Sequence, residues 1–177
     1  MKAFFAEKYG IPEEVSEVDK PVVNDDQVLV RVRATSVNRG DYYMLRGRPL
    51  FIRAVTGLRR PERSIPGSDV AGQVEAVGKN VTQFTPGDAV FGARGGATAE
   101  YVAARETAFV AKPANVTFEQ AAAGPVAAIT ALQGLRDKGR LQAGQHALIN
   151  GASGGVATFA IQIAKALGAD VTAVCHM

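Results

Sequence analysis

The run GASGGVA, which begins at Gly151, is the part of the sequence whose residue types and spacing most directly suggest chemistry. Two kinds of site fit it. Gly151, Gly154 and Ala157 are small enough to let main-chain amides approach the diphosphate of a dinucleotide. Alternatively, the first five residues match G-x-S-x-G, the turn that presents the nucleophilic serine of a hydrolase, here Ser153. The surrounding segments decide between these interpretations.

The segments on either side of this run predict a strand, a helix and a second strand. Residues 146–150 are short and apolar, an apolar-periodic helix extends to about Gly168, and residues 170–175 form another strand-like run. A β-α-β unit of this kind favours parallel strands joined by a right-handed crossover. At the start of its helix, unpaired N–H groups and a partial positive charge suit a phosphate. The glycine spacing is therefore interpreted as a phosphate cradle.

The hydrolase interpretation requires a general base and an orienting acid after the nucleophile. The segment that follows Ser153 contains one histidine, His176, and one acid, Asp170, and both lie on or beside the second strand. No long loop is left to bring a histidine back over the serine. We therefore favour the phosphate cradle, in which Ser153 donates its hydroxyl or N–H group to a phosphate or caps the helix.

The first part of the chain predicts short strands separated by turns. Residues 27–35 alternate, with Val28, Val30, Val32 and Ala34 on one side, a pattern typical of a half-buried strand. Further strand-like runs occupy residues 69–78, 84–92, 98–104 and 107–113. Many short strands separated by turn signals predict a small all-β barrel or sandwich.

The character of the sequence changes near residue 115, where an alanine-rich helical stretch begins. Thr117 and Gln120 form a capping-box pattern at its start. Pro125 lacks an N–H group and clashes with a preceding helical turn, so it predicts the start of a second helix that ends near Gly139. These helices separate a β-rich first part of the chain from an α/β second part.

The composition is that of an ordinary globular protein. The 177 residues are 47% hydrophobic and 21% charged, and the net charge of +3 is too small to suggest nucleic-acid binding by itself. A single cysteine, Cys175, excludes an internal disulfide and most cysteine-based metal sites. The charged N-terminal residues do not form a signal peptide, and no apolar run approaches the roughly 20 residues of a membrane helix. We expect a cytoplasmic protein with no membrane partner.

One segment stands apart in charge. Seven arginines and only two acids, Asp41 and Glu62, lie between Arg39 and Arg63. A charge run of this kind is usually a solvated loop, which is the interpretation we adopt. The alternative is a loop that attracts an anionic substrate or the phosphates of a cofactor.

Taken together, these segments resemble the medium-chain dehydrogenase/reductase superfamily, in its zinc-free quinone-oxidoreductase-like branch. The similar segments follow the order of that family and cover nearly the whole chain: VRVRATSVNRGDYYMLRG, PGSDVAGQVEAVGKNVTQFTPGDAVFG, AEYVA, KPANVTFEQAAAGPVAAITALQGL and INGASGGVATFAIQIAKALGADVTAVC. The resemblance implies an α+β chain, with an N-terminal GroES-like β-barrel domain over residues 1–122 and a partial, truncated Rossmann α/β unit over residues 123–177. It also implies an active site between the two domains and a homodimer in the full-length form.

The resemblance further implies hydride transfer between NAD(P)H and a quinone, an enone or another carbonyl substrate. Zinc-dependent members carry cysteine at the position of Asn38 and near Val126, and histidine at the position of Ser68. None of the residues present here is a good zinc ligand, so we expect no zinc. Reduction of an enone or quinone needs no Lewis acid, because a hydrogen bond can stabilise the developing oxygen charge and water or a phenol can supply the proton.

By the same resemblance, Asn38 and Thr130 neighbour the nicotinamide and the substrate, and Tyr42 or Tyr43 donates to the substrate oxygen. Each also has a plain structural explanation: Asn38 as a turn residue at a strand end, Thr130 as a buried helix hydroxyl, and the two tyrosines as packing residues. We take Asn38 and Tyr43 as the candidate catalytic residues. The candidate cofactor-binding residues are Thr130, Gly151, Ala152, Ser153, Gly154, Gly155, Val156 and Ala157.

The expected cofactor is NADPH rather than NADH. In NAD-selective folds, an acid near the end of the second strand, roughly 20 residues past the glycines, holds the ribose 2′-OH. That position falls near Cys175, where the sequence carries no acid. The adjacent His176 could instead contact a 2′-phosphate.

The sequence departs from the family pattern at Met177, where it stops. One helix and two parallel strands leave sheet faces and an edge uncovered, and they lack the strand across the crevice in which a dinucleotide lies. We therefore expect little activity from these residues alone, either because they are a fragment of a longer protein or because a partner or second copy completes them. Two other functions stay open: an interaction module with a vestigial nucleotide site, and a serine hydrolase that uses Ser153.

Overall fold

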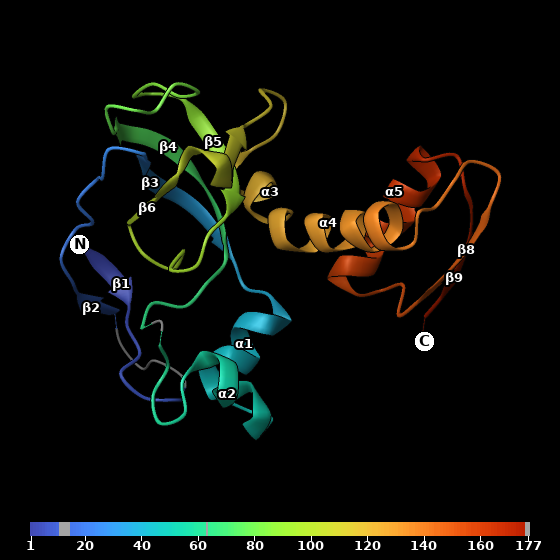
Figure 1. Ribbon diagram of the computed structural model, residues 1–177, viewed down its shortest axis with the longest axis horizontal. Coiled ribbons are helices and arrows are strands. Elements are labelled where there is room, and N and C mark those ends of the chain that lie inside the picture. The colour runs from blue at the N-terminus through green and yellow to red at the C-terminus, as the bar shows by residue number, and fades with distance from the viewer. Residues whose placement is uncertain (11–14, 63, 176–177) are drawn as a thin grey trace. The chain divides into compact units, whose positions relative to one another are not determined.

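The computed structural model describes residues 1–10, 15–62 and 64–175. It divides into two compact units, Met1–Pro125 and Val126–Met177, each of which is described by itself (Figure 1). This division falls a few residues beyond the boundary expected after residue 122. The reason is that α3 (Phe118–Ala122) packs against strands of the first unit, and the next helix begins only at Pro125.

The first unit is built on an antiparallel sheet of five strands in the order β6-β3-β4-β5-β7. Their bounds are β3 (Gln27–Ser36), β4 (Asp69–Val77), β5 (Ala89–Ala93), β6 (Tyr101–Arg105) and β7 (Phe109–Ala111). Each of these strands overlaps one of the strand-like runs of the sequence, so their existence, though not every boundary, is confirmed.

The predicted barrel is not closed among the described residues. β6 and β7 are the edge strands of the sheet, and β1 (Lys2–Phe4) pairs with β2 (Val15–Glu17) in a separate two-stranded sheet. A bridge between Ala3 and Ala99 links β1 to the chain just before β6. Because β1 is only three residues long, this bridge does not extend into a ladder that would close the sheet.

Strand β3 shows how the alternating sequence pattern becomes a packed face. Val28 and Val30 are fully buried whereas Arg31 is exposed, as the period of two predicts. Leu29 departs from the alternation and is buried as well. Two register shifts against β4, one on each side of the stretch 30–32, bend the paired strands. The main core comprises Val28, Val30, Val70, Val74, Phe84, Val90, Ala97, Val102, Ala104 and Phe109.

Helix α3 packs against a second cluster on the same sheet. Ala121 and Ala122 lie with Ala71 of β4 in this cluster. The Thr117 hydroxyl accepts a hydrogen bond from the Gln120 N–H group at 3.2 Å, and the Gln120 side chain accepts one from the Thr117 N–H group at 3.0 Å. The capping box predicted from the sequence is therefore confirmed.

The arginine-rich segment is not the continuous loop that its charge suggests. It contains α1 (Arg39–Arg46), a 3-10 turn (Leu50–Ile52) and α2 (Arg53–Thr56). α1 begins after Asn38, whose main-chain N–H group donates to the Asp41 carboxylate, and it ends at Gly47 with φ 57°. Local capping at both ends of the helix therefore outweighs the repulsion between neighbouring arginines.

The β-α-β unit predicted for the end of the chain is present in the second unit. Its elements are α4 (Pro125–Leu132), a π-helical segment (Gln133–Lys138), β8 (His146–Asn150), α5 (Gly155–Ala166) and β9 (Asp170–Val174). β8 and β9 pair in parallel, from His146 opposite Asp170 to Asn150 opposite Val174. The helix start at Pro125 is also confirmed.

The two-stranded sheet of the second unit is packed on one face. Ile149 of β8 lies in a cluster with Ala131, Ala160 and Ala164 from the helices. Its neighbour Leu148 points the other way and is 71% exposed, so the opposite face is uncovered, as expected for so small a sheet. Among the described residues, no helix combines the length and the apolar character that crossing a membrane requires.

Substitution of Phe109 by alanine is expected to lower the free energy of unfolding of the first unit by about 3–5 kcal/mol. Phe109 is buried in the main core, and deleting its side chain removes apolar burial and leaves a cavity. All four tyrosines, residues 9, 42, 43 and 101, belong to this unit and the chain has no tryptophan. Urea unfolding followed by tyrosine fluorescence therefore reports on the first unit.

The adjacent residue Val110 supplies the matched control, because it lies on the same strand and is exposed. Val110→Ala is expected to change the free energy of unfolding by less than about 1 kcal/mol. Equal losses of unfolding free energy from Phe109→Ala and Val110→Ala would contradict the assignment of Phe109 to the buried face of β7.

Candidate functional site

The glycine-rich turn joins the carboxyl end of β8 to the start of α5. Gly151 has φ 73°, a left-handed conformation that glycine adopts without strain. Gly154 donates its N–H group to the Gly151 carbonyl oxygen at 2.9 Å, which closes the turn. Ala152 donates to the Val174 carbonyl oxygen at 2.9 Å and fastens the turn to the end of β9. The turn is thus held at the strand ends, where dinucleotide-binding folds place the diphosphate.

The main-chain amides at the start of α5 are available to a ligand. Gly154 is the N-cap residue, and the N–H groups of Gly155, Val156 and Ala157 have no partner among the described residues. A Cβ atom at Gly155 would meet no other atom within 4 Å, so the space beside this residue is open. Three unpaired donors at the positive end of a helix fit the charge and size of a diphosphate.

Ser153 is exposed and does not cap the helix, since Gly154 occupies that position. The cap interpretation of Ser153 is therefore wrong. Asp170 pairs with His146 at the amino end of the two parallel strands, whereas Ser153 follows their carboxyl end. Four residue steps of about 3.3 Å separate these ends by about 13 Å, too far for Asp170 to orient a base beside Ser153. His176 lies outside the described residues.

Thr130 lies on α4 in the same unit as the glycine-rich turn and is exposed, so it is not a buried helix hydroxyl. Its hydroxyl donates to the Val126 carbonyl oxygen at 2.6 Å, one helical turn earlier. The hydroxyl hydrogen is thereby used within the helix, and lone pairs of the oxygen remain for an external donor. α4 is held against β8, because Ala131 packs in the same cluster as Ile149.

In the first unit, a buried carboxylate holds the side chain of Asn38. Asp69 at the start of β4 is 0% exposed, and its Oδ2 atom accepts hydrogen bonds from Asn38 Nδ2 and Ser36 Oγ, each at 2.8 Å. The orientation of the Asn38 amide is fixed by this contact. Its second amide hydrogen is left for another partner.

A second buried carboxylate, Asp41, lies in the first turn of α1 and is 5% exposed. Its Oδ2 atom accepts a hydrogen bond from the Asn38 N–H group at 2.8 Å, and its Oδ1 atom accepts one from Ser68 Oγ at 2.6 Å. Asn38 therefore contacts Asp41 through its main chain and Asp69 through its side chain. Each of the four hydrogen bonds described here comes from a neutral donor.

Sequence reasoning missed the two buried acids. Asp41 was counted only as one of two acids among many arginines, although its spacing from Asn38 is that of a helix-capping pair. Asp69 carried a weaker signal, as an acid at the start of an otherwise apolar strand. Its burial follows from contacts with Ser36 and Asn38, which are distant in the sequence.

The two tyrosines of α1 lie beside arginines. Their rings are 5.6 Å apart in an edge-to-face arrangement, and the Arg39 guanidinium lies 5.6 Å from the centre of the Tyr43 ring. The Tyr42 hydroxyl accepts a hydrogen bond from Arg46 at 2.5 Å, whereas the Tyr43 hydroxyl has no partner among the described residues. Of the pair, Tyr43 is the residue whose hydroxyl is open to a ligand.

The positions that hold zinc in related zinc-dependent members do not fit a zinc ion in this chain. Asn38 uses its amide nitrogen to donate to Asp69, and Ser68 donates its hydroxyl to Asp41. Val126 has no ligand atom in its side chain. Within residues 1–10, 15–62 and 64–175, no group of three or more His, Cys, Asp or Glu side chains is arranged to hold a metal ion. No chemical step is therefore assigned to zinc.

Asp69→Ala is expected to lower the free energy of unfolding of the first unit by about 2–4 kcal/mol. The Ser36 hydroxyl and the Asn38 amide would each lose a charged acceptor, and the site offers no replacement. Tyrosine fluorescence during urea unfolding measures the loss. Asp25→Ala is the control, because Asp25 pairs with Lys79 at the surface and should contribute less than about 1 kcal/mol. A loss from Asp69→Ala no larger than that of the control would refute the structural role of the buried acid.

Comparison with known proteins supplies relatives for both units. The family described as the alcohol dehydrogenase GroES-like domain matches residues 24–114. A chloroplastic quinone-oxidoreductase homolog of Spinacia oleracea is 39% identical over 170 residues, covering 90% of this chain and 50% of the relative. The quinone oxidoreductase of Sus scrofa is 40% identical over 177 residues, covering 97% of this chain and 51% of the relative. The chain thus spans about half the length of these relatives.

Solved structures give the same assignment. An alcohol dehydrogenase superfamily protein from Novosphingobium aromaticivorans has a TM-score of 0.90 at 35% identity, covering 100% of this chain and 54% of that chain. The quinone oxidoreductase of Escherichia coli, solved in complex with NADPH, has a TM-score of 0.83 at 28% identity, covering 100% of this chain and 53% of that chain. The chain therefore belongs to the medium-chain dehydrogenase/reductase superfamily, among its quinone-oxidoreductase-like members, of which it represents the N-terminal portion.

Proposed function

We propose that this chain supplies the N-terminal part of a zinc-independent oxidoreductase that transfers a hydride from NADPH to a quinone, an enone or another carbonyl compound. The observation that carries the proposal is the open set of amides at Gly155, Val156 and Ala157, held where β8 turns into α5. The relative from Escherichia coli that was solved with NADPH supports it.

Each group of candidate residues has a task in this function. The amides of residues 155–157 bind the diphosphate, and the bound nicotinamide supplies the hydride. The Thr130 oxygen, whose own hydrogen lies on Val126, accepts a hydrogen bond and so suits the carboxamide NH₂ group of a nicotinamide. The second amide hydrogen of Asn38 donates to the substrate oxygen as negative charge develops there. Tyr43, whose hydroxyl has no partner among the described residues, delivers the proton.

The proposal assigns no role to zinc, because Asn38, Ser68 and Val126 are poor zinc ligands. A hydrogen bond from Asn38 stabilises a developing oxyanion in the way that a Lewis acid otherwise would, but more weakly. Reduction of an activated carbonyl or alkene needs less of this stabilisation than alcohol oxidation, in which a hydroxyl must first be deprotonated. A site that offers a hydrogen bond in place of a metal ion therefore suits the reduction of activated carbonyls and alkenes better than the oxidation of alcohols.

The preference for NADPH rests on the end of β9. Val174 and Cys175 occupy the place where an NAD-selecting acid would hold the ribose 2′-OH. The acid of this strand, Asp170, lies at its opposite end, across from His146. A cytoplasmic location and a homodimer of the full-length form belong to the same proposal.

Two alternatives differ in their support. Ser153 has no acid partner within reach on β9, so the serine hydrolase has no structural observation in its favour. An interaction module with a vestigial nucleotide site is a real alternative, because the folded β unit does not by itself require a cofactor. Nucleotide binding separates it from the enzyme.

NADPH is expected to bind the 177-residue chain and to shift the amide resonances of residues 153–157 in a saturable way. The ¹⁵N-labelled protein, titrated with NADPH and then with NADH, measures both affinities by NMR. NADPH should bind more tightly, because no acid repels its 2′-phosphate at the end of β9. Shifts confined to other residues, or none at all, would favour the interaction module.

Gly155→Val is expected to weaken NADPH binding at least about tenfold while leaving the fold intact. The site has room for a side chain within the chain itself, but that side chain would occupy the space in front of the amides. Gly134→Ala is the matched control, since a Cβ atom there also meets nothing within 4 Å and Gly134 lies in the π-helical segment, away from the turn. Unchanged NADPH affinity in Gly155→Val would contradict the assignment of the glycine-rich turn as the diphosphate-binding site.

A further inference from the structure

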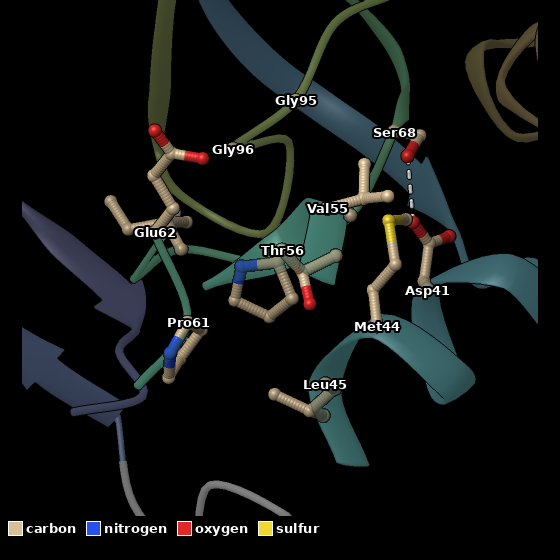
Figure 2. Close-up of a pocket in the computed structure, with 13 residues that line it drawn as sticks. Asp41, Met44, Leu45, Val55, Thr56, Pro61, Glu62, Ser68, Gly95 and Gly96 are labelled. Atoms are coloured by element: carbon tan, nitrogen blue, oxygen red, sulfur yellow. Dashed lines mark hydrogen bonds between the residues drawn. The ribbon is translucent and has the colours of Figure 1, made fainter. Parts of the chain in front are cut away.

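Between Leu50 and Leu58, the chain turns large apolar side chains toward solvent. Leu50, Phe51, Val55 and Leu58 are 68–82% exposed, and we call these four residues the apolar strip. Single exposed apolar side chains are common, but several close together mark a contact surface. Val55 and Leu58 line one surface hollow, and Val55 and Met44 line another (Figure 2). The apolar surface is therefore continuous from the strip to α1.

Polar contacts on the inner side of this segment hold the strip outward. The 3-10 turn that begins at Leu50 continues directly into α2, which ends at Thr56. Arg53 donates from Nε to the Gly47 carbonyl oxygen at 3.0 Å, and its guanidinium lies 4.5 Å from the centre of the Tyr9 ring. The Thr56 hydroxyl is 2.8 Å from the Tyr9 hydroxyl. Polar side chains thus anchor the segment to the protein while most of its apolar ones face solvent, the reverse of an ordinary surface helix.

Positive charge is concentrated around the apolar strip. Residues 39–60 contain six arginines and a single acid, the buried Asp41, whereas the rest of the first unit has fourteen acids and ten Lys and Arg residues. Arg48 precedes the strip, Arg59 and Arg60 follow it, and all three are exposed. The strip is therefore flanked on both sides by accessible cations.

The hollow beside Leu58 brings cations against apolar side chains. Its described lining includes Val55 and Leu58 of the strip, and four Lys or Arg residues against two acids, Glu7 and Glu62. The acids offset only part of the positive charge. An anionic group in contact with the strip therefore meets more cations than acids.

The charge and the exposure of this surface favour one kind of partner. A second copy docked through the same face would bring two sets of arginines together, and their repulsion opposes such a dimer. Apolar side chains that protrude this far need matching pockets in a protein partner, whereas a fluid bilayer adapts to them. Anionic lipids complete the match, because their headgroups attract the flanking arginines.

We infer that the apolar strip and its flanking arginines bind the surface of a bilayer that contains anionic lipids. The strip enters the headgroup region, and Arg48, Arg59 and Arg60 contact the lipid phosphates. This inference revises the expectation of no membrane partner, which considered only segments that span a membrane. Apolar quinones dissolve in bilayers, so the contact would bring a reductase to such substrates. That consequence alone rests on the proposed function.

Co-sedimentation with lipid vesicles tests the inference on the 177-residue chain without any nucleotide. One set of vesicles is phosphatidylcholine alone, and the other contains about 30% phosphatidylglycerol, an anionic lipid. The fraction of protein that sediments, measured against lipid concentration, gives the partition coefficient. We expect partitioning onto the anionic vesicles to be at least about tenfold stronger, and to fall at least about fivefold between about 0.1 M and about 0.5 M NaCl, because salt screens the charges.

Two substitutions test the apolar and the charged parts separately. Val55→Ser shortens the apolar strip, and Arg59→Gln removes one flanking cation. Each is expected to weaken partitioning onto the anionic vesicles at least about fivefold. Both side chains are exposed, so the fold should be unaffected, and urea unfolding followed by tyrosine fluorescence checks this.

Val22→Ser and Arg105→Gln are the matched controls, because both residues are exposed and lie near the other end of β3. Arg105 pairs with Gln27 at the start of β3, and nine residue steps of about 3.3 Å separate Gln27 from Ser36, after which the arginine-rich segment begins. Val22 precedes β3 by five residues. Each control should change partitioning by less than about twofold.

Partitioning that falls in Val55→Ser and Arg59→Gln but not in the controls supports the inference. Equal partitioning onto both kinds of vesicle, or none onto either, overturns it. A loss in Arg59→Gln with none in Val55→Ser overturns the insertion of the apolar strip. A chain that is dimeric by size-exclusion chromatography and becomes monomeric in Val55→Ser assigns the strip to a second copy and also overturns the inference. Because NADPH takes no part, failure here leaves the proposed function standing.

Discussion

Two buried carboxylates set the geometry of the first unit. Asp41 and Asp69 are 5% and 0% exposed, and burying a charge is costly unless hydrogen bonds replace its hydration. Here Ser36, Asn38 and Ser68 supply those bonds. Because these donors come from the end of β3, the start of α1 and the residue before β4, the two acids tie together three segments that are separate in the sequence.

The same constraint decides what the surrounding groups can do. Asn38 cannot rotate freely, since its amide nitrogen is committed to Asp69, so one hydrogen and one oxygen of the amide keep a fixed direction. Ser68 cannot donate to a ligand, since its hydrogen is committed to Asp41. One network therefore fixes both the Asn38 amide and the Ser68 hydroxyl.

The parts of the fold that sequence reasoning predicted are those whose signals are local. The alternation in β3, the capping box at Thr117 and the helix start at Pro125 each depend on residues within a few positions of one another. The glycine-rich turn is equally local: the positive φ of Gly151 and the unpaired amides after Gly154 follow from the strand-turn-helix sequence. Its fastening to Val174 was not foreseen, because that contact joins two strands.

What the sequence left open or misjudged depends on contacts that are not local, or on a local signal that was given too little weight. The sequence left a barrel or a sandwich open, because closure depends on how far β1 pairs beside β6, which a count of strands does not give. The arginine-rich segment was expected to be a loop because its charge was weighed above the capping pair Asn38 and Asp41.

The arginine-rich segment shows what a count of charges along the sequence leaves out. Net charge along a segment describes the long-range field. Arg39 and Arg46 lie over the rings of Tyr43 and Tyr42, whereas Asp41 is buried and accepts hydrogen bonds from Asn38 and Ser68. The position of each of these charged groups therefore depends on local capping and on contacts with residues distant in the sequence, not on the net charge of the segment.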